Sequence, residues 1–191
     1  MTNISKRFII KIPSEILVLY DPKLKTLLIK TDKKQKVLKL KVKVIVLKEK
    51  NLIVVTNIPN DKQSNKLKNL FKSLQGTTLS LIKQSFLEVT SVTCKKLKLS
   101  GIGYKVFESR LEDRKFLHLK LGNSHSLYYK IPEKIVIKII QSSKLFIFGD
   151  DYAKVCQIAA LIRSYKKPEP YKGKGILYAN EIIKLKEGKK I

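Results

Sequence analysis

The feature that most constrains the fold of this chain is a strand–turn–strand–helix pattern that occurs twice. In the first copy, residues 37–46 alternate apolar and basic side chains, which predicts one half-buried strand of period two. A turn at 48–51 leads to a second strand at 52–56, and residues 59–61 (Pro-Asn-Asp) end that strand and offer a helix N-cap. A helix follows, with apolar side chains at i, i+3, i+4 and i+7 from Leu67 to Leu74.

The second half of the chain repeats this order of elements. An apolar strand at 135–140 is followed by a turn at 141–144 and a further strand at 145–149. Two aspartates at 150–151 then provide an N-cap for a helix whose apolar face lies between Tyr152 and Ile162. The second copy therefore predicts the same small unit as the first.

The spacing of the two copies indicates a duplication. Leu52 and Leu145 are 93 residues apart in the chain, and so are Val42 and Ile135. A shared offset across both strands of a hairpin is typical of tandem copies of one supersecondary unit.

We therefore predict an α+β fold of two tandem duplicated domains, with an extended basic arm near the C-terminus. The first domain is expected at residues 1–87 and the second at residues 88–191. In each domain, a mostly antiparallel sheet packs on one helix and leaves its other face exposed. The lysines on alternate positions of the first predicted strand are interpreted as solvated side chains that discourage edge pairing: Lys39, Lys41 and Lys43.

The charge of the chain limits its partners. Its 41 Lys and Arg residues exceed its 15 Asp and Glu residues by enough to give a formal net charge of +26. Such an excess destabilises a compact chain unless a polyanion neutralises it. Nucleic acid is the favoured polyanion because phosphate contacts release counterions. An anionic membrane surface is the alternative partner. The remaining explanation is a well-solvated surface without such a partner.

Chemistry-bearing motifs are missing from the sequence. Cys94 and Cys156 have no Cys or His neighbour at metal-ligand spacing and are expected to be free, buried thiols. No Ser–His–Asp order or metal cluster is recognisable, and no apolar stretch reaches 18 residues. We expect no enzyme activity, no cofactor, no metal, no small-molecule ligand and no membrane span.

The segment at residues 166–176, called the arm below, is the main candidate for RNA binding. Pro168 and Pro170 restrict the backbone to extended conformations, and Gly173 and Gly175 allow close approach to another surface. Its four lysines can reach phosphates, and Tyr171 can stack on a base or a sugar. A plain linker to a C-terminal strand is the alternative interpretation.

Two further segments are weaker candidates. The glycine–tyrosine segment, residues 99–106, is interpreted as a strand whose alternate glycines leave one face bare for a backbone or a ligand. The polar turn, residues 122–126, is interpreted first as a hairpin turn, with RNA contact by His125 as the alternative.

These segments resemble the universal ribosomal large-subunit protein six family. The resemblance is densest from Leu97 to Lys189, and the arm with Tyr178 and Glu181 is very close to the C-terminal signature of that family. It departs from the bacterial pattern in the polar turn, at Asn123 and Ser126, which puts RNA contact by that turn in doubt. The other matching residues are Gly76-Thr77-Thr78, Gly101-Ile102-Gly103-Tyr104, Gly122, Ser124-His125 and Leu185-Lys186-Glu187-Gly188-Lys189.

The resemblance implies a structural component of the large ribosomal subunit. It would bind large-subunit ribosomal RNA near the factor-binding region at the base of the stalk, beside neighbouring ribosomal proteins, mainly through its second domain. The lysine-rich first domain favours an organelle-encoded protein of a mitochondrial ribosome, with a plastid or bacterial ribosome as alternatives. A basic RNA-binding accessory protein outside the ribosome is the competing function. The residues expected to bind RNA are Lys166, Lys167, Pro168, Glu169, Pro170, Tyr171, Lys172, Gly173, Lys174, Gly175, Gly101, Gly103, Tyr104, Lys105, Ser124 and His125.

Overall fold

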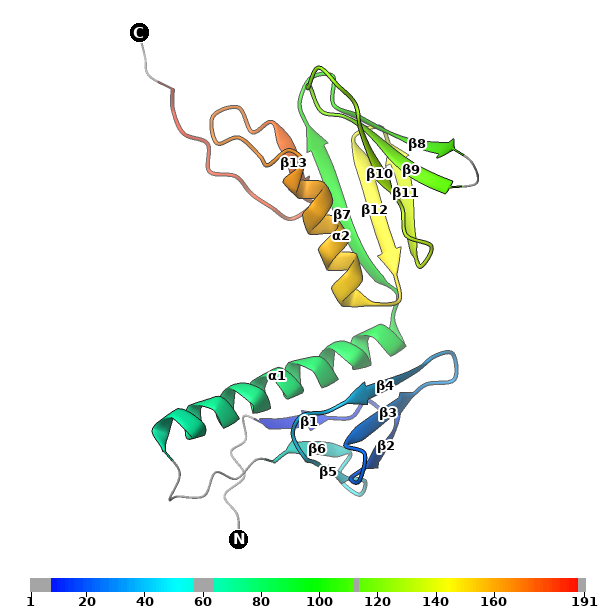
Figure 1. The fold of residues 1–191 in the computed structure, drawn as a ribbon, viewed down its shortest axis with the longest axis vertical. Coiled ribbons are helices and arrows are strands. Elements are labelled where there is room, and N and C mark those ends of the chain that lie inside the picture. The colour runs from blue at the N-terminus through cyan, green and yellow to red at the C-terminus, as the bar shows by residue number, and fades with distance from the viewer. Residues whose placement is uncertain (1–7, 57–63, 112–113, 189–191) are drawn as a thin grey trace. The chain divides into compact units, whose positions relative to one another are not determined.

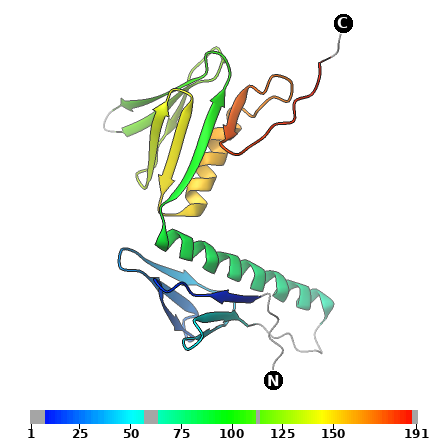
Figure 2. The same ribbon diagram turned by 180° about the vertical axis from the view of Figure 1, so that it is seen from behind.

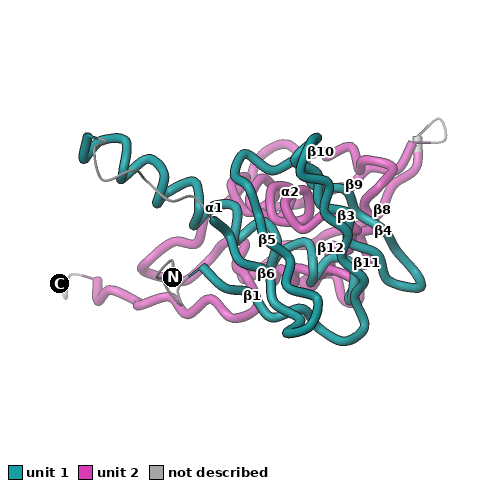
Figure 3. The backbone as a smooth tube through the Cα atoms, turned by 90° about the horizontal axis from the view of Figure 1, so that it is seen from below, with its two compact units in different colours: residues 1–91 teal, residues 92–191 magenta. Residues whose placement is uncertain are grey.

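The computed structural model of this chain describes residues 8–56, 64–111 and 114–188. The chain divides into two compact units, residues 1–91 and residues 92–191 (Figure 3). The division falls four residues beyond the boundary that the sequence suggests, at 87/88, because the helix of the first unit continues to Thr90.

The described residues of unit 1 form six strands and one helix (Figure 1). Its strands form two antiparallel three-stranded sheets, with the orders β1-β6-β5 and β2-β3-β4. The core between these sheets and the helix contains the fully buried side chains of Leu27, Ile29, Ile53 and Ile82. The elements are β1 (Ile9–Lys11), β2 (Leu17–Asp21), β3 (Thr26–Lys30), β4 (Gln35–Lys39), β5 (Val44–Leu47), β6 (Leu52–Val55) and α1 (Asn65–Thr90).

The single strand expected at residues 37–46 is wrong. The chain forms β4 up to Lys39 and β5 from Val44, and these two strands belong to different sheets. The alternation of burial continues across the break, since Leu40 and Val42 are buried while Lys41 is exposed. The periodic pattern therefore persists while the pairing partner changes, which the pattern alone does not reveal.

The helix face expected at Leu67–Leu74 is only partly correct. Leu67 and Leu70 are 43% and 53% exposed, whereas Leu74 packs against the core. The buried positions of α1 lie between Gln75 and Val89, because this part of the helix contacts the sheets. The N-cap expected at residues 59–61 lies outside the described residues.

Unit 2 repeats the plan of unit 1 and adds a strand (Figures 1 and 2). One sheet has the order β11-β12-β7-β13, and the other has the order β10-β9-β8. Both sheets and α2 contribute side chains to a single core. The elements are β7 (Thr93–Ser100), β8 (Lys105–Leu111), β9 (Arg114–Lys120), β10 (Leu127–Lys130), β11 (Ile135–Gln141), β12 (Lys144–Gly149), α2 (Tyr152–Ser164) and β13 (Gly175–Tyr178).

The expected second hairpin and its helix are confirmed. β11 and β12 pair in antiparallel register across the turn at residues 141–144. Asp151 is the N-cap of α2, and its carboxylate accepts a hydrogen bond of 3.0 Å from the backbone N–H of Ala153. The helix buries Val155, Ile158, Ala159 and Ile162, whereas Tyr152 at its start is 39% exposed.

The sheet topology confirms two tandem α+β repeats. In unit 1 the strand order β5-β6-β1 corresponds to β11-β12-β7 in unit 2, and the order β2-β3-β4 corresponds to β8-β9-β10. Among the described elements, each set of six strands is followed by one helix. Only β13, which pairs with β7, is an addition among the described elements, and its first two residues are the last two of the arm.

Because each unit has its own core, a cavity in one core should destabilise that unit alone. Leu27→Ala in unit 1 and Leu117→Ala in unit 2 each truncate a fully buried side chain, and should lower the free energy of unfolding of the affected unit by about 2–5 kcal/mol. Amide hydrogen exchange should accelerate throughout the mutated unit and remain unchanged in the other. Equal acceleration in both units after either substitution would show a single cooperative domain.

Candidate nucleic-acid interface

The arm is a closed loop between two buried anchors. It joins α2, whose last core residue Ile162 is fully buried, to β13, where Ile176 is fully buried. The N–H of Ile176 donates to the carbonyl of Lys166 over 2.9 Å and so closes the loop. Two more backbone bonds cross it, from Glu169 N–H to the Lys174 carbonyl (2.9 Å) and from Gly173 N–H to the Glu169 carbonyl (3.0 Å). The prolines make the backbone extended locally, but the segment as a whole folds back on itself.

Gly175 allows the two ends of the arm to touch. A Cβ atom at this position would lie 2.5 Å from Cα of Pro168 and 2.8 Å from the carbonyl oxygen of Lys167, and its φ is +152°. A side chain is therefore excluded by contacts and by backbone conformation. The close approach that the glycine permits is to its own loop, and Gly175 itself is buried.

The outer part of the arm is available to a partner. Lys167, Glu169, Pro170 and Lys172 are exposed, and Tyr171 is 54% exposed. Lys166, Pro168, Gly173 and Lys174 are half-buried. The arm thus presents an aromatic ring beside lysines on a backbone that is already held in place.

The segment after β13 is fastened to the last turn of α2 and to the middle of the arm. The guanidinium of Arg163, in the last turn of α2, forms a two-pronged ion pair with Glu181, with Nε at 3.0 Å from Oε2. The hydrogen bond from Arg163 is the main reason that the pKa of Glu181 is lowered, and the same bond raises the pKa of Arg163. Further along, the N–H of Lys186 donates to the carbonyl of Pro170 over 2.9 Å.

The glycine–tyrosine segment contains a turn at residues 101–104, called the glycine–tyrosine turn below, and the expectation of a continuous strand there is wrong. β7 ends at Ser100 and β8 begins at Lys105, while Gly101 and Gly103 have φ values of +146° and +79°. Such φ values are incompatible with a strand of L residues.

The ring of Tyr104 occupies the space that the glycines leave. Cβ atoms at Gly101 and at Gly122 would each lie 3.1 Å from this ring. Tyr104 therefore links the glycine–tyrosine turn to the polar turn, and packs against the core of unit 2. At the tip of the same turn, Ile102 is 94% exposed.

The polar turn joins β9 to β10, as the hairpin interpretation predicts. Its residues Ser124 and His125 are exposed. Asn123, which departs from the bacterial pattern, accepts a hydrogen bond of 3.3 Å from the ammonium group of Lys166. The arm and the polar turn are therefore in direct contact.

All three candidate segments lie at one end of unit 2 (Figure 1). Ser100 at the end of β7 pairs with Gly175 at the start of β13, and Lys105 at the start of β8 pairs with Lys120 at the end of β9. Antiparallel pairing thus gathers segments that are far apart in the sequence. The exposed lysines at this end are Lys98, Lys105, Lys120, Lys144, Lys167 and Lys172.

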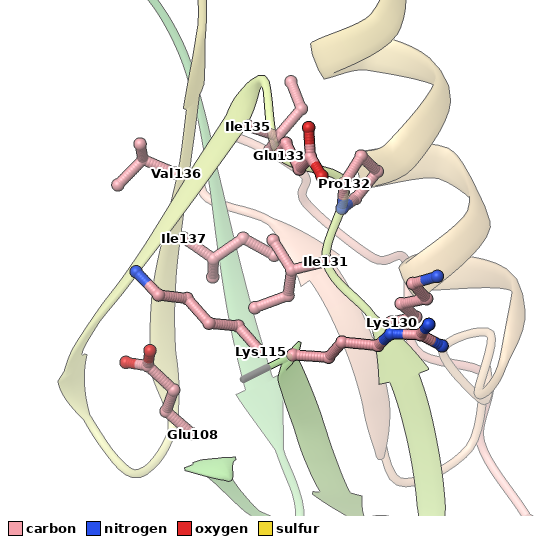
Figure 4. A pocket seen from close by; sticks show the side chains of 10 residues that line it. Glu108, Lys115, Lys130, Ile131, Pro132, Glu133, Ile135, Val136 and Ile137 are labelled. Carbon is pink, nitrogen blue, oxygen red and sulfur yellow. The ribbon is translucent and has the colours of Figure 1, made fainter. Parts of the chain in front are cut away.

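A cavity of about 430 Å³ lies elsewhere in unit 2 (Figure 4). Ile131 and Ile137 lie at its centre in Figure 4, and charged side chains lie around them. Its lining contains none of the residues that the sequence assigns to RNA binding.

Further findings on the described residues concern membranes, metals and thiols. Over these residues no helix has the length and apolarity needed to cross a membrane, and no three His, Cys, Asp or Glu side chains are grouped to hold a metal. Cys94 and Cys156 are free thiols, as expected, but they are half-buried rather than buried. Burial still raises the pKa of the Cys94 thiol.

Comparison with known proteins identifies the family. The family description "Ribosomal protein L6" matches residues 100–179, a range that includes the arm and both turns. The large ribosomal subunit protein uL6 of Chlorobium phaeobacteroides (strain BS1) is 41% identical over 137 residues, which cover 72% of this chain and 70% of that relative. The chain belongs to the ribosomal protein L6 family.

Other L6 relatives show similar agreement. The large ribosomal subunit protein uL6 of Mycoplasma capricolum (strain California kid) is 40% identical over 141 residues, covering 74% of this chain and 72% of the relative. The uL6 protein of Rhodopseudomonas palustris (strain BisB18) is 43% identical over 122 residues, covering 64% and 67%. L6 proteins are a family of ribosomal proteins and not a family of enzymes.

Sequence reasoning assigned no role to several contacts that hold the candidate interface together. The ion pair of Arg163 and Glu181 depends on how the arm closes, so no local sequence pattern predicts this pair. The contact of Asn123 with Lys166 spans 43 residues of sequence. The family resemblance did include Glu181, but it did not indicate that Arg163 is the residue with which Glu181 pairs.

Closure of the arm should depend on the absence of a side chain at residue 175. Gly175→Ala places a methyl group against the backbone of Pro168, so it should lower the free energy of unfolding of unit 2 by at least about 2 kcal/mol. Gly188→Ala is the control, because a Cβ atom there meets nothing within 4 Å. Chemical denaturation measures both, and an unaltered Gly175→Ala protein would contradict the described closure.

The ion pair of Glu181 should make stability depend on pH. The folded-state pKa of Glu181 is below its ordinary value of 4.5, so its stabilisation is fully present above about pH 4.5 and is lost as the pH falls through the lowered pKa. Glu181→Gln should reduce the free energy of unfolding by about 1 kcal/mol at pH 7. The difference from wild type should shrink below pH 4.5, whereas Glu187→Gln, at an exposed carboxylate, should change little at any pH. A difference that persists unchanged in acid would rule out the charge of Glu181 as its cause.

Proposed function

We propose that this protein is a structural constituent of the large ribosomal subunit and binds large-subunit ribosomal RNA through the end of unit 2 that carries the arm. One observation carries the proposal: the arm is closed by its own backbone hydrogen bonds while Tyr171 and Lys172 remain exposed. The relatives compared above are named large ribosomal subunit proteins. The match to the L6 family covers this same end of the unit.

Preorganisation favours RNA binding by this loop. Fixing a flexible basic segment on RNA costs conformational entropy, which weakens binding. In this protein most of that entropy is lost during folding, because Ile176 is buried and three backbone hydrogen bonds hold the arm closed. Binding then gains the release of counterions from phosphates and stacking on the exposed Tyr171 ring.

The candidate residues divide into two roles. We propose that Gly101, Tyr104 and Gly175 shape the surface from within. The Tyr104 ring fills the space beside Gly101, and the backbone of Pro168 fills the space beside Gly175. Exposed or half-buried side chains at the same end make the RNA contacts, and Glu169 orients the arm by accepting from a base amino group or a ribose hydroxyl. The proposed contact residues are Lys105, Ser124, His125, Lys166, Lys167, Pro168, Glu169, Pro170, Tyr171, Lys172 and Lys174, with Gly103 and Gly173 allowing close approach.

The finer assignments rest on the family resemblance. We propose a position near the factor-binding region at the base of the stalk, in contact with neighbouring ribosomal proteins. The relatives compared above are bacterial, and a mitochondrial ribosome stays a prediction from the lysine-rich composition. Cosedimentation of the tagged protein with intact large subunits tests the ribosomal role. Recovery only in free RNA complexes would favour the accessory RNA-binding function instead.

The arm should contribute more to RNA affinity than other lysines do. Lys172→Ala with Lys174→Ala should weaken binding to structured ribosomal RNA, and should reduce the slope of log affinity against log salt by about 0.7–0.9 for each lost phosphate contact. The matched control is Lys39→Ala with Lys41→Ala, which removes the same charge from exposed positions of unit 1. Titrations at several salt concentrations measure both, and equal losses for the two pairs would make the arm a linker.

A further inference from the structure

We propose that a second surface of unit 2, the outer face of the β8–β9–β10 sheet, stacks unpaired bases of the RNA that the arm binds. This proposal rests on the proposed function, because it extends the same RNA over a neighbouring surface. The chemistry that it assigns to the surface is the stacking of nucleobases on aromatic rings, with phosphates held by flanking lysines.

Three aromatic side chains form a row across this sheet, called the aromatic row below. In the strand register, His118 of β9 lies opposite Phe107 of β8 on one side and opposite Tyr128 of β10 on the other. The rings of His118 and Tyr128 are stacked, with centroids 4.7 Å apart and planes 12° apart, and the Phe107 centroid is 6.0 Å from His118. The row is thus a continuous aromatic surface.

The aromatic row faces away from the core. Strand residues alternate between the two faces of a sheet, and the neighbours Val106, Leu117 and Leu119 are buried in the core of unit 2. Phe107 and Tyr128 are 42% and 57% exposed. The outer face of a one-sided antiparallel sheet is usually polar, so an exposed row of rings indicates a partner.

The charge beside the row favours a polyanion as that partner. Lys105 and Lys120 are directly opposite each other in the register, next to the aromatic row and on the same face, and both are exposed. Like charges at such cross-strand positions destabilise a sheet, and a phosphate between them reverses the sign of the interaction. The described outer positions of these strands, from Lys105 to Lys130, carry no acidic side chain.

The position of these lysines joins the row to the proposed interface. Lys105 follows the glycine–tyrosine turn directly, and Lys120 precedes the polar turn. An RNA segment held by the arm and the turns therefore meets this lysine pair before it reaches the rings. No separate binding event is needed to bring a base to the row.

Two polar atoms on this face also lack partners inside the protein. Within the described chain, the buried side-chain polar atoms without a hydrogen bond include Ser109 Oγ and His118 Nε2, and both residues are on outer positions of this sheet. Buried polar groups are nearly always satisfied in folded proteins. The polar edge of a base can supply such a partner only when the side chains that cover these atoms move aside.

A single tryptophan can report on stacking, because the chain contains none. In Tyr128→Trp, binding of a fluorescently labelled, unstructured 12-nucleotide RNA is followed by anisotropy of the label, while the tryptophan emission is recorded in parallel. We expect the emission to fall by about half as the RNA binds, through stacking with a base. A fully paired RNA duplex should bind without this loss.

The matched control is Tyr152→Trp, since Tyr152 is also a partly exposed tyrosine of unit 2, at the start of α2. Its emission should remain unchanged. If Tyr128→Trp does not fold, Phe107→Trp probes the other end of the aromatic row. A second experiment compares Tyr128→Leu with wild type. The variant should lose about five-fold or more of its affinity for the unstructured RNA. Its salt slope should be unaltered because no charge is removed.

The outcomes separate this proposal from the proposed function. Bound RNA with unchanged emission at residue 128 overturns the aromatic row as a stacking surface and leaves RNA binding by the arm intact. Failure of all the RNAs to bind overturns the proposed function as well. Crosslinks from Tyr128 to protein instead of RNA in assembled particles would assign this face to a neighbouring protein and overturn the proposal.

Discussion

The antiparallel pairing of β13 with β7 is the interaction on which the candidate interface depends. It buries Ile176 completely and brings Gly175 opposite Ser100, so the C-terminal end of the arm is fixed beside the glycine–tyrosine turn. The other end is fixed by α2, and Arg163 then ties that helix to Glu181 beyond β13. A loop held at both ends loses little further entropy on binding, which is why a segment so rich in proline, glycine and lysine can be an ordered surface.

The high positive charge becomes understandable from this arrangement. A net charge of +26 opposes folding by self-repulsion, yet each unit keeps an apolar core and places its lysines on the outside. At the arm end of unit 2, exposed lysines come from four different strands and from the arm. The repulsion among them is a cost in the isolated protein, and under the proposed function phosphates of the RNA would lie between them and turn it into a gain in affinity.

The outcome for particular elements shows how far sequence patterns reach. The strands of the second hairpin, the cap at Asp151 and the buried face of α2 are local features, and they were predicted correctly. The break between β4 and β5 was missed, because the alternation of burial runs on through Leu40 and Val42 while the pairing partner changes. Two glycines on alternate positions predict a strand with one face free of side chains in the glycine–tyrosine segment. The structure has a turn there, in which both glycines adopt positive φ values.

The sequence by itself determined the two α+β repeats and the family, since a repeated hydrophobic period and the C-terminal signature are encoded in the local order of residues. It also marked the arm through its residue types. Only the tertiary structure decided that the arm closes on Pro168, that Tyr104 fills the space beside two glycines, and that Phe107, His118 and Tyr128 share a row. These facts depend on strand register and loop closure, which arise from contacts between residues that lie far apart in the chain, and no local pattern encodes such contacts.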